Sequence, residues 1–265
     1  MEIARPTSLE EATACLERWP DATILAGGTD LMVEVNLAGH RPQRIVSLHR
    51  AGELNLVDGR RIGAGVTFQT LERSSHAALA QLARTVGSPQ IRTVGTIGGN
   101  LGTASPAGDS LPFLAALDAD IELVSAAGHR VVPFADFMTG VKQTSIRPGE
   151  LIGAAILPAQ VPRRQAFAKV GVRNSMVISI VSGCIVRSDD GRTRIAMGAV
   201  GPTMIRPGAA EEMISAERNP TAAACDEFAR LVAEAVKPIT DHRATAEYRR
   251  HASGVLARRL LERVL

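Results

Sequence analysis

The sequence predicts an α+β protein in which a larger N-terminal domain is followed by a smaller C-terminal domain. Near the N-terminus, a strand, a glycine-containing loop, a helix and a second strand follow one another, whereas the later part of the chain has the alternating pattern of antiparallel strands. Between these regions, Pro158, Pro162 and the Arg163-Arg164 pair mark a domain boundary. We therefore expect domains of residues 1–160 and 161–265.

The N-terminal domain begins with a predicted helix and a β–loop–α–β unit. Ser8 and Glu11 have the spacing of a capping box, and an apolar face at helical spacing follows them. Strands are expected at 22–25 and 44–48, joined through a loop and a helix. Units of this kind place ligands at the carboxyl ends of their strands. These elements form a first subdomain of about residues 1–55.

A second subdomain of about residues 56–160 is expected to contain paired strands. The Asp58-Gly59 turn lies between two strand-like runs, and further strands are expected at 121–124 and 151–157. The segment from Gly87 to Asp109 is rich in glycine and serine, so we predict a loop there.

The C-terminal domain is predicted to contain a three-stranded antiparallel sheet followed by helices. The Asp189-Asp190-Gly191 turn joins the last two strands. Two helical segments end the chain. The expected strands are 166–172, 177–186 and 194–200, and the expected helices are 221–236 and 243–265.

The composition argues against nucleic acid and membranes as partners. The net charge is only +3, no Lys/Arg run is present, and aromatic residues make up 3% of the chain, so no nucleic-acid surface is expected. The longest apolar stretch, 176–186, is too short to span a bilayer, and the first residues lack the apolar core of a signal peptide. We therefore expect a cytoplasmic chain without a membrane span.

Residues that bind metals are few and scattered. Cys15, Cys184 and Cys225 form no C-x-x-C pair, and the six histidines lack metal-ligand spacing. The sequence thus predicts no metal site and no iron–sulfur cluster within this chain. No catalytic nucleophile or acid–base pair is indicated either.

The first candidate binding segment reads Ile24-Leu25-Ala26-Gly27-Gly28-Thr29-Asp30-Leu31. Adjacent glycines permit a positive φ and let an oxygen-rich ligand approach the backbone. Free N–H groups in the loop and at the start of a following helix would form an anion site. The same residues fit a plain strand-to-helix turn, and the motif alone leaves both interpretations open.

The second candidate segment is Thr96-Ile97-Gly98-Gly99-Asn100, followed by the stretch from Ala104 to Asp109. Paired glycines beside hydroxyl and amide side chains suit a pyrophosphate. One such loop could be a decorated turn, but two of them favour two loops that bind one long nucleotide. Neither has the G-x-G-x-x-G or Walker pattern, which disfavours a Rossmann site.

Together these segments resemble the FAD-binding (medium) subunit of the xanthine dehydrogenase and carbon monoxide dehydrogenase family of molybdenum hydroxylases. The resemblance extends over nearly the whole chain and continues in the segments 149–152 and 166–173. It implies a PCMH-type FAD-binding domain of two subdomains, and a smaller α+β domain that helps to cover the flavin.

The resemblance also implies a set of cofactor-binding residues. Segments 24–31 and 96–100 would wrap the FAD pyrophosphate. Asp109 would contact the adenosine half, and Lys169 would lie near the pyrimidine edge of the flavin. The full set is Ile24, Leu25, Ala26, Gly27, Gly28, Thr29, Asp30, Leu31, Val86, Thr96, Ile97, Gly98, Gly99, Asn100, Asp109, Ile152, Lys169 and Val177.

Two features bear on the chemistry that the resemblance implies. An ammonium near flavin N1 and O2 would stabilise the anionic reduced flavin and raise its potential, although a lysine on a strand is ordinarily solvated. Met176 and Val177 stand where relatives carry an aspartate or an aromatic residue, which puts the use of NAD in doubt. The Lys-x-Gly-x-Arg form at 169–173 is closer to relatives that act on N-heteroaromatic compounds.

The resemblance implies an oxidoreductase subunit that carries electrons. They would come from a molybdopterin large subunit through an iron–sulfur small subunit, reach FAD on this chain, and pass to NAD or another acceptor. The sparse cysteines agree with clusters on a partner. Two alternatives stay open: a free-standing FAD-dependent oxidase of the vanillyl-alcohol-oxidase type, and a non-redox nucleotide-binding module.

Overall fold

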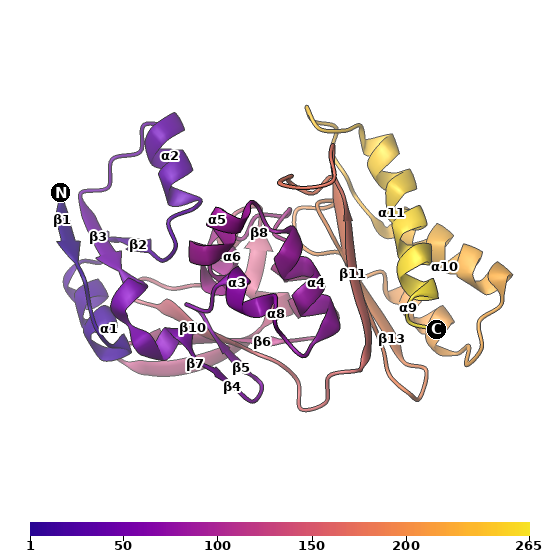
Figure 1. Cartoon of the computed structure of the whole chain (residues 1–265), viewed down its shortest axis with the longest axis horizontal. Coiled ribbons are helices and arrows are strands. Elements are labelled where there is room, and N and C mark those ends of the chain that lie inside the picture. The colour runs from indigo at the N-terminus through magenta and orange to yellow at the C-terminus, as the bar shows by residue number, and fades with distance from the viewer.

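The N-terminal region is built on a small parallel sheet. The structure is a computed structural model and describes all residues from 1 to 265. Three strands lie in the order β1-β3-β2, and all are parallel. Figure 1 shows this unit at one end of an elongated molecule, with helix α2 standing away from the body. The elements are β1 (Glu2–Ala4), α1 (Leu9–Arg18), β2 (Thr23–Leu25), α2 (Leu31–Leu37) and β3 (Arg44–Ser47).

Helix α1 has the predicted N-terminal cap, with one difference. The Ser8 hydroxyl accepts a hydrogen bond from the N–H of Glu11 at 3.1 Å, as a capping box requires. The Glu11 carboxylate does not return to Ser8; it accepts from the N–H and hydroxyl of Thr7 at 2.7 and 2.9 Å. The apolar face of α1, with Ala12 and Leu16, packs on β3 through Val46.

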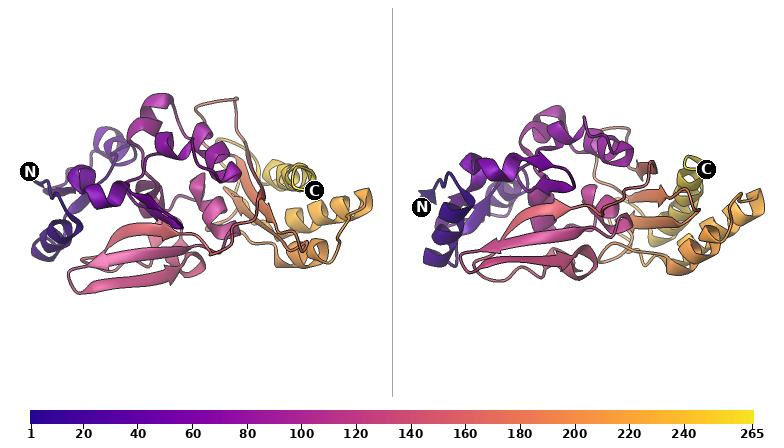
Figure 2. Two further views of the ribbon diagram at one scale, coloured as in Figure 1. Left: turned by 60° about the horizontal axis from the view of Figure 1, so that its bottom comes forward. Right: turned by 90° about the horizontal axis from the view of Figure 1, so that it is seen from below.

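The second region is a five-stranded antiparallel sheet covered by helices. Its strand order is β4-β5-β10-β6-β7. Figure 2 shows β6, β7 and β10 on one side of the helices that follow β5. The strands of this sheet are β4 (Val57–Asp58), β5 (Arg61–Gly63), β6 (Asp120–Ser125), β7 (Gly128–Pro133) and β10 (Leu151–Ile156). The short elements before and between them are η1 (Leu48–Arg50), η2 (Gly52–Asn55), α8 (Phe134–Phe137), β8 (Met138–Gly140) and β9 (Gln143–Thr144).

The segment predicted as a loop, Gly87 to Asp109, is largely helical, so that prediction was wrong. A Cβ on Gly98 would lie 2.5 Å from the Cβ of Ala64, and glycine therefore lets this helix touch the sheet. The low helix propensity of its glycines hides the helix in the sequence. The helices of this region are α3 (Phe68–Leu71), α4 (Ala77–Thr85), α5 (Pro89–Val94), α6 (Ile97–Thr103) and α7 (Ser110–Ala116).

The C-terminal region confirms the predicted three-stranded antiparallel sheet. Its order is β11-β12-β13, and helices cover one face. Strand β12 begins later than expected, and helix α9 was not predicted. The elements are β11 (Arg164–Val170), β12 (Val181–Arg187), β13 (Thr193–Gly198), α9 (Gly208–Ser215), α10 (Ala222–Ala235) and α11 (Ala246–Glu262). The predicted α+β class is thus confirmed.

Helix α7 joins the two domains. All seven of its residues are buried, and it packs on both β12 and β13. The largest hydrophobic cluster accordingly includes residues from both sides of the junction, such as Leu114 and Cys184. None of the helices is long and apolar enough to cross a membrane.

Two buried arginines organise the C-terminal domain. Arg187 donates to Thr193 and to carbonyls at the end of α9, including that of Glu217 at 2.6 Å. Arg249 donates to the carbonyl of Ile180 at 2.7 Å and to the Asp241 carboxylate at 2.7 Å. A buried guanidinium needs such acceptors, because desolvation without them costs several kcal/mol.

Asp241 makes the stability of this domain depend on pH. Burial raises the pKa of Asp241, but donors from Arg243, Arg249 and Ala244 outweigh it and hold the pKa well below its usual range. A depressed pKa stabilises the fold above the unfolded value, about 4, and the stabilisation is lost as pH falls below it. We expect Asp241→Asn to lower the unfolding free energy by roughly 1–3 kcal/mol at pH 7 and by less at pH 3.

Urea unfolding at the two pH values measures this difference. Asp136→Asn is the control, because Asp136 is exposed and its carboxylate makes no hydrogen bond or ion pair. An equal loss at both pH values for Asp241→Asn would contradict the assignment.

Candidate functional site

The two glycine-containing segments lie against each other. A Cβ on Gly27 would lie 1.9 Å from the carbonyl oxygen of Val94, so only glycine fits there. Further along, the Thr103 hydroxyl donates to the Asp30 carboxylate at 3.2 Å. The loop after β2 therefore contacts the residues on both sides of the second segment, and the structure brings the two predicted binding segments close together.

The first loop presents backbone donors that the chain itself does not use. The N–H groups of Gly27, Gly28, Thr29 and Asp30 donate no hydrogen bond within the protein. Gly28 has a φ of +71°, a conformation that side chains rarely adopt. Successive free N–H groups of this kind form a concave anion site. The donors present thus fit a phosphate group.

The second segment uses its own backbone donors differently. The N–H of Gly99 donates to the Thr96 hydroxyl at 3.0 Å. The N–H groups of Ile97 and Gly98 donate to the carbonyls of Val66 and Ala64, just after β5. A Cβ on Gly99 would meet only the Thr96 hydroxyl, at 3.2 Å. This segment therefore contributes an unobstructed surface beside Gly99, which is the second feature that fits a bound nucleotide.

An ion pair lies at the start of α7, across the domain junction. Lys169 on β11 places its ammonium 2.5 Å from the Asp109 carboxylate, and the two side chains are 9% and 8% exposed. The same ammonium donates to the carbonyls of Thr85 at 2.9 Å and Val177 at 3.1 Å. Ser179 donates to the other carboxylate oxygen at 2.7 Å. All three Lys169 protons and both Asp109 oxygens are thus engaged.

Burial raises the pKa of Asp109, whereas the Lys169 ammonium and the Ser179 hydroxyl act in the opposite direction. Burial is the largest effect, so the pKa lies above its ordinary value. The negative charge of Asp109 therefore depends on these two partners. Removal of either one would favour the protonated carboxyl.

The remaining predicted residues divide between these two places. Asn100 links them, since it accepts from the Ser110 hydroxyl at 2.6 Å next to Asp109. Ile152 packs beside α6, where its Cδ1 lies 3.8 Å from a Cβ placed on Gly102. Val86 follows Thr85, whose carbonyl Lys169 binds. Ile24, Leu25, Ala26 and Leu31 flank the first loop, and Ile24 is 39% exposed.

The resemblance places Asp109 at the adenosine half of FAD and Lys169 at the flavin edge, yet the two side chains form one ion pair. A single part of the cofactor, either the adenosine half or the flavin edge, therefore lies next to both residues. Lys169 also differs from the solvated strand lysine of the alternative interpretation, because its side chain is only 9% exposed.

Sequence reasoning missed two side chains of this region. Ser179 was placed on a strand, but β12 begins only at Val181, and Ser179 turns toward Asp109. Lys142 has a φ of +54°, and its ammonium lies 3.4 Å from Glu34 on α2. Neither position carries a sequence signal, because both depend on how separate segments meet.

No group of three or more His, Cys, Asp or Glu side chains is placed to hold a metal ion, and the three cysteines are free.

Comparison with known proteins identifies the family. The model of the FAD binding domain in molybdopterin dehydrogenase matches residues 1–160, and that of the CO dehydrogenase flavoprotein C-terminal domain matches residues 166–264. The nicotinate dehydrogenase FAD-subunit of Eubacterium barkeri is 35% identical over 233 residues, covering 80% of this chain and 79% of its own. The xanthine dehydrogenase FAD-binding subunit of Escherichia coli O157:H7 is 32% identical over 275 residues, covering 97% and 93%.

A solved structure agrees with these relatives. The cyanide-inactivated form of the Cu,Mo-CO dehydrogenase contains a chain that superposes with a TM-score of 0.91 at 28% identity, covering 100% of this chain and 97% of that one. The chain therefore belongs to the FAD-binding subunits of the xanthine dehydrogenase and carbon monoxide dehydrogenase family, and it is an oxidoreductase subunit with FAD as its cofactor.

Proposed function

We propose that this chain is the electron-transfer subunit of a molybdenum hydroxylase complex. Electrons would arrive from iron–sulfur clusters on a small partner subunit, after substrate oxidation on a molybdopterin large subunit, and would leave to an external acceptor. The observation that carries the proposal is the pair of adjacent glycine segments, with free backbone donors, next to the buried Asp109–Lys169 pair. Bound FAD would supply a carrier that exchanges electrons singly or in pairs.

Within this proposal, each part of the site has its own role. The N–H groups of Gly27 to Asp30 would hold the pyrophosphate, and the surface at Gly99 would accommodate it. The Asp109–Lys169 pair, hydrogen-bonded to the Ser179 hydroxyl and the Val177 carbonyl, would lie beside the flavin end and keep water away. Val86 and Ile152 would supply apolar contacts to the cofactor.

We further propose that the complex acts on an N-heteroaromatic compound. Nicotinate and xanthine, which name two of the relatives described above, both contain nitrogen heterocycles. The Lys-x-Gly-x-Arg segment at 169–173 also supports this substrate class. These relatives are named as subunits, which favours a complex over a free-standing oxidase.

The first prediction concerns the surface at Gly99. We expect Gly99→Val to fold, because a Cβ there meets only the Thr96 hydroxyl, which must shift by a few tenths of an ångström, yet to weaken FAD binding by at least about tenfold because the side chain occupies cofactor space. Gly52→Val is the matched control, since nothing lies within 4 Å of a Cβ at Gly52. Quenching of FAD fluorescence gives the dissociation constant, and thermal unfolding reports the fold. Equal FAD affinity in both variants would exclude Gly99 from the site.

The second prediction concerns charge at the flavin end. At a pH where Asp109 is ionised, Lys169→Met leaves an extra negative charge, so the potential of bound FAD should fall by roughly 30 mV or more, about 1.4 kcal/mol for two electrons. Asp109→Asn should raise it, and the double variant, with no net change in charge, should return close to the original value.

Potentiometric titration of the bound flavin measures all three variants. Lys237→Met is the control, because Lys237 is exposed and lies in the C-terminal region away from this pair. Unchanged potentials in both single variants would show that the ion pair does not face the flavin.

A further inference from the structure

Helix α7 is tied to the C-terminal domain at both of its ends. At its N-terminus, Asp109 pairs with Lys169 of β11 at 2.5 Å. Just beyond its C-terminus, Asp118 pairs with Arg194 of β13 and with Arg206, both at 2.6 Å. A short, completely buried helix therefore connects the Asp109–Lys169 pair to the two ion pairs of Asp118.

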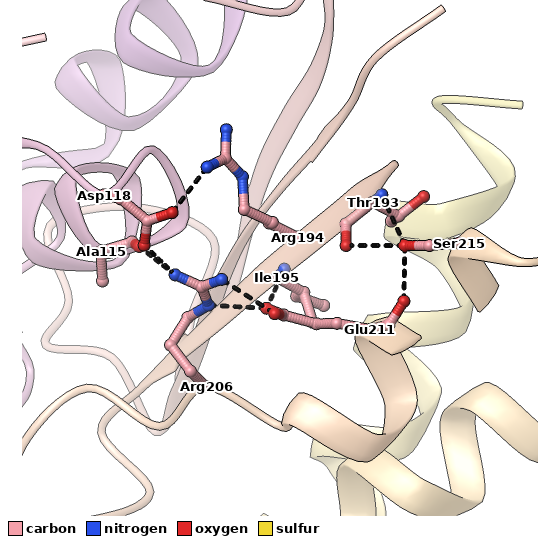
Figure 3. A network of polar contacts seen from close by, with 8 residues as sticks. All are labelled: Ala115, Asp118, Thr193, Arg194, Ile195, Arg206, Glu211 and Ser215. Atoms are coloured by element: carbon pink, nitrogen blue, oxygen red, sulfur yellow. Dashed lines mark hydrogen bonds and ion pairs between the residues drawn. The ribbon is translucent and has the colours of Figure 1, made fainter. Parts of the chain in front are cut away.

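The Asp118 cluster is a continuous polar network, drawn in Figure 3. Arg206 donates to the carbonyl of Ala115 at 2.7 Å, to Asp118, and to both oxygens of Glu211 at 2.6 and 2.8 Å. Glu211 in turn accepts from the N–H of Ile195 at 2.8 Å. Arg206 therefore links the end of α7 to helix α9 and to strand β13, and it does so from the C-terminal domain.

The backbone at Asp118 has an unusual conformation. Its φ is +50°, in the left-handed region, which non-glycine residues adopt at a cost of about 1–2 kcal/mol. Asparagine and aspartate tolerate this region best. The conformation directs the carboxylate toward both guanidinium groups, as Figure 3 shows.

A surface depression lies beside this cluster. Its volume is about 280 Å³, and its lining includes Asp118, Phe134, Met204 and Arg206. The ion pairs of Asp118 therefore lie at the solvent-facing edge of the domain junction, whereas α7 itself is buried.

We propose that Asp118 is a positioning residue for the cofactor site, acting through α7 on the Asp109–Lys169 pair. This inference rests on the proposed function, since it assigns that pair to FAD. The physical reason is that α7 is rigid and contacts β12 and β13 along its length. Pro112, in its middle, lies so close to Gly198 that a Cβ there would be 2.9 Å from the proline ring.

A helix held in its middle transmits a shift of one end to the other. If the ion pairs of Asp118 are lost, we expect the C-terminal end of α7 to shift relative to β13 and the 2.5 Å contact between Asp109 and Lys169 at its other end to lengthen. The attraction of a buried pair falls as the separation grows, and the bonds from Lys169 to Thr85 and Val177 require the same alignment.

The test is the FAD affinity of the full chain carrying Asp118→Asn. Asparagine keeps the size and the left-handed backbone but removes the charge. Two partly exposed ion pairs are lost, so the dissociation constant should rise roughly three- to tenfold. Asp120→Asn is the control, because Asp120 lies two residues away and its carboxylate makes no ion pair. Equal affinities in the two variants would overturn the proposal.

A second background separates positioning from general destabilisation. In Lys169→Met, Asp118 has no pair left to align, so adding Asp118→Asn should change the dissociation constant by less than about twofold. A general loss of stability would instead add in full, and additivity would overturn the proposal. Lys169→Met alone must weaken FAD binding. If it does not, Lys169 does not belong to the FAD site, and the role given to it in the proposed function is wrong.

Hydrogen exchange without FAD distinguishes the two kinds of failure. Asp118→Asn should increase exchange in residues 165–180, where β11 and Ser179 meet α7, whereas Asp120→Asn should not. Increased exchange with unchanged FAD affinity would show a real connection between the domains that does not serve the cofactor. Unchanged exchange of residues 165–180 in Asp118→Asn would show that Asp118 does not influence the Asp109–Lys169 pair through α7.

Discussion

The buried ion pair between Asp109 and Lys169 constrains the rest of the structure. Two charges removed from water cost several kcal/mol each unless every donor and acceptor finds a partner. Here the partners come from four segments: the end of α4 at Thr85, the start of α7, strand β11, and the turn that contains Val177 and Ser179. Because those segments belong to both domains, the pair can form only when the domains are docked. The charges of the site therefore depend on how the two domains are docked.

Close backbone contact is the second constraint, and it acts at the other end of the site. The loop after β2 touches α5 at Gly27, and α6 touches the central sheet at Gly98, at distances that no Cβ allows. These contacts place the free N–H groups of the first loop next to the open surface at Gly99. Glycine has two separate uses here. At Gly27 and Gly98 it permits packing between protein segments, whereas at Gly99 the space beside it is left for a ligand.

The sequence predicted the elements whose signals are local. Helix α1 has a cap and an apolar face, so it was predicted closely. The three C-terminal strands alternate, and a turn at Gly191 joins the last two, so the sheet was predicted although β12 begins later than expected. Helix α6 was not predicted, because its three glycines have low helix propensity, although Gly98 is required for the close contact with Ala64. The two binding segments followed from composition and resemblance. Ser179 and Asp118 did not, because each owes its role to residues far away in the sequence.

The division of the site between two domains has a consequence for how its electrostatics can vary among relatives. The backbone donors that we propose for the pyrophosphate belong to the N-terminal domain alone, whereas the charges beside the proposed flavin end come from both domains. Affinity for the nucleotide part can therefore persist while changes in the C-terminal domain alter the flavin environment. The turn from Gly171 to Ser179 is the place where such changes cost least, because most of its side chains are exposed and only the Val177 backbone carbonyl and the Ser179 hydroxyl contact the buried pair. Met176, with a φ of +49°, lies in this turn, where substitution can alter the surface beside the proposed flavin end without disturbing either core.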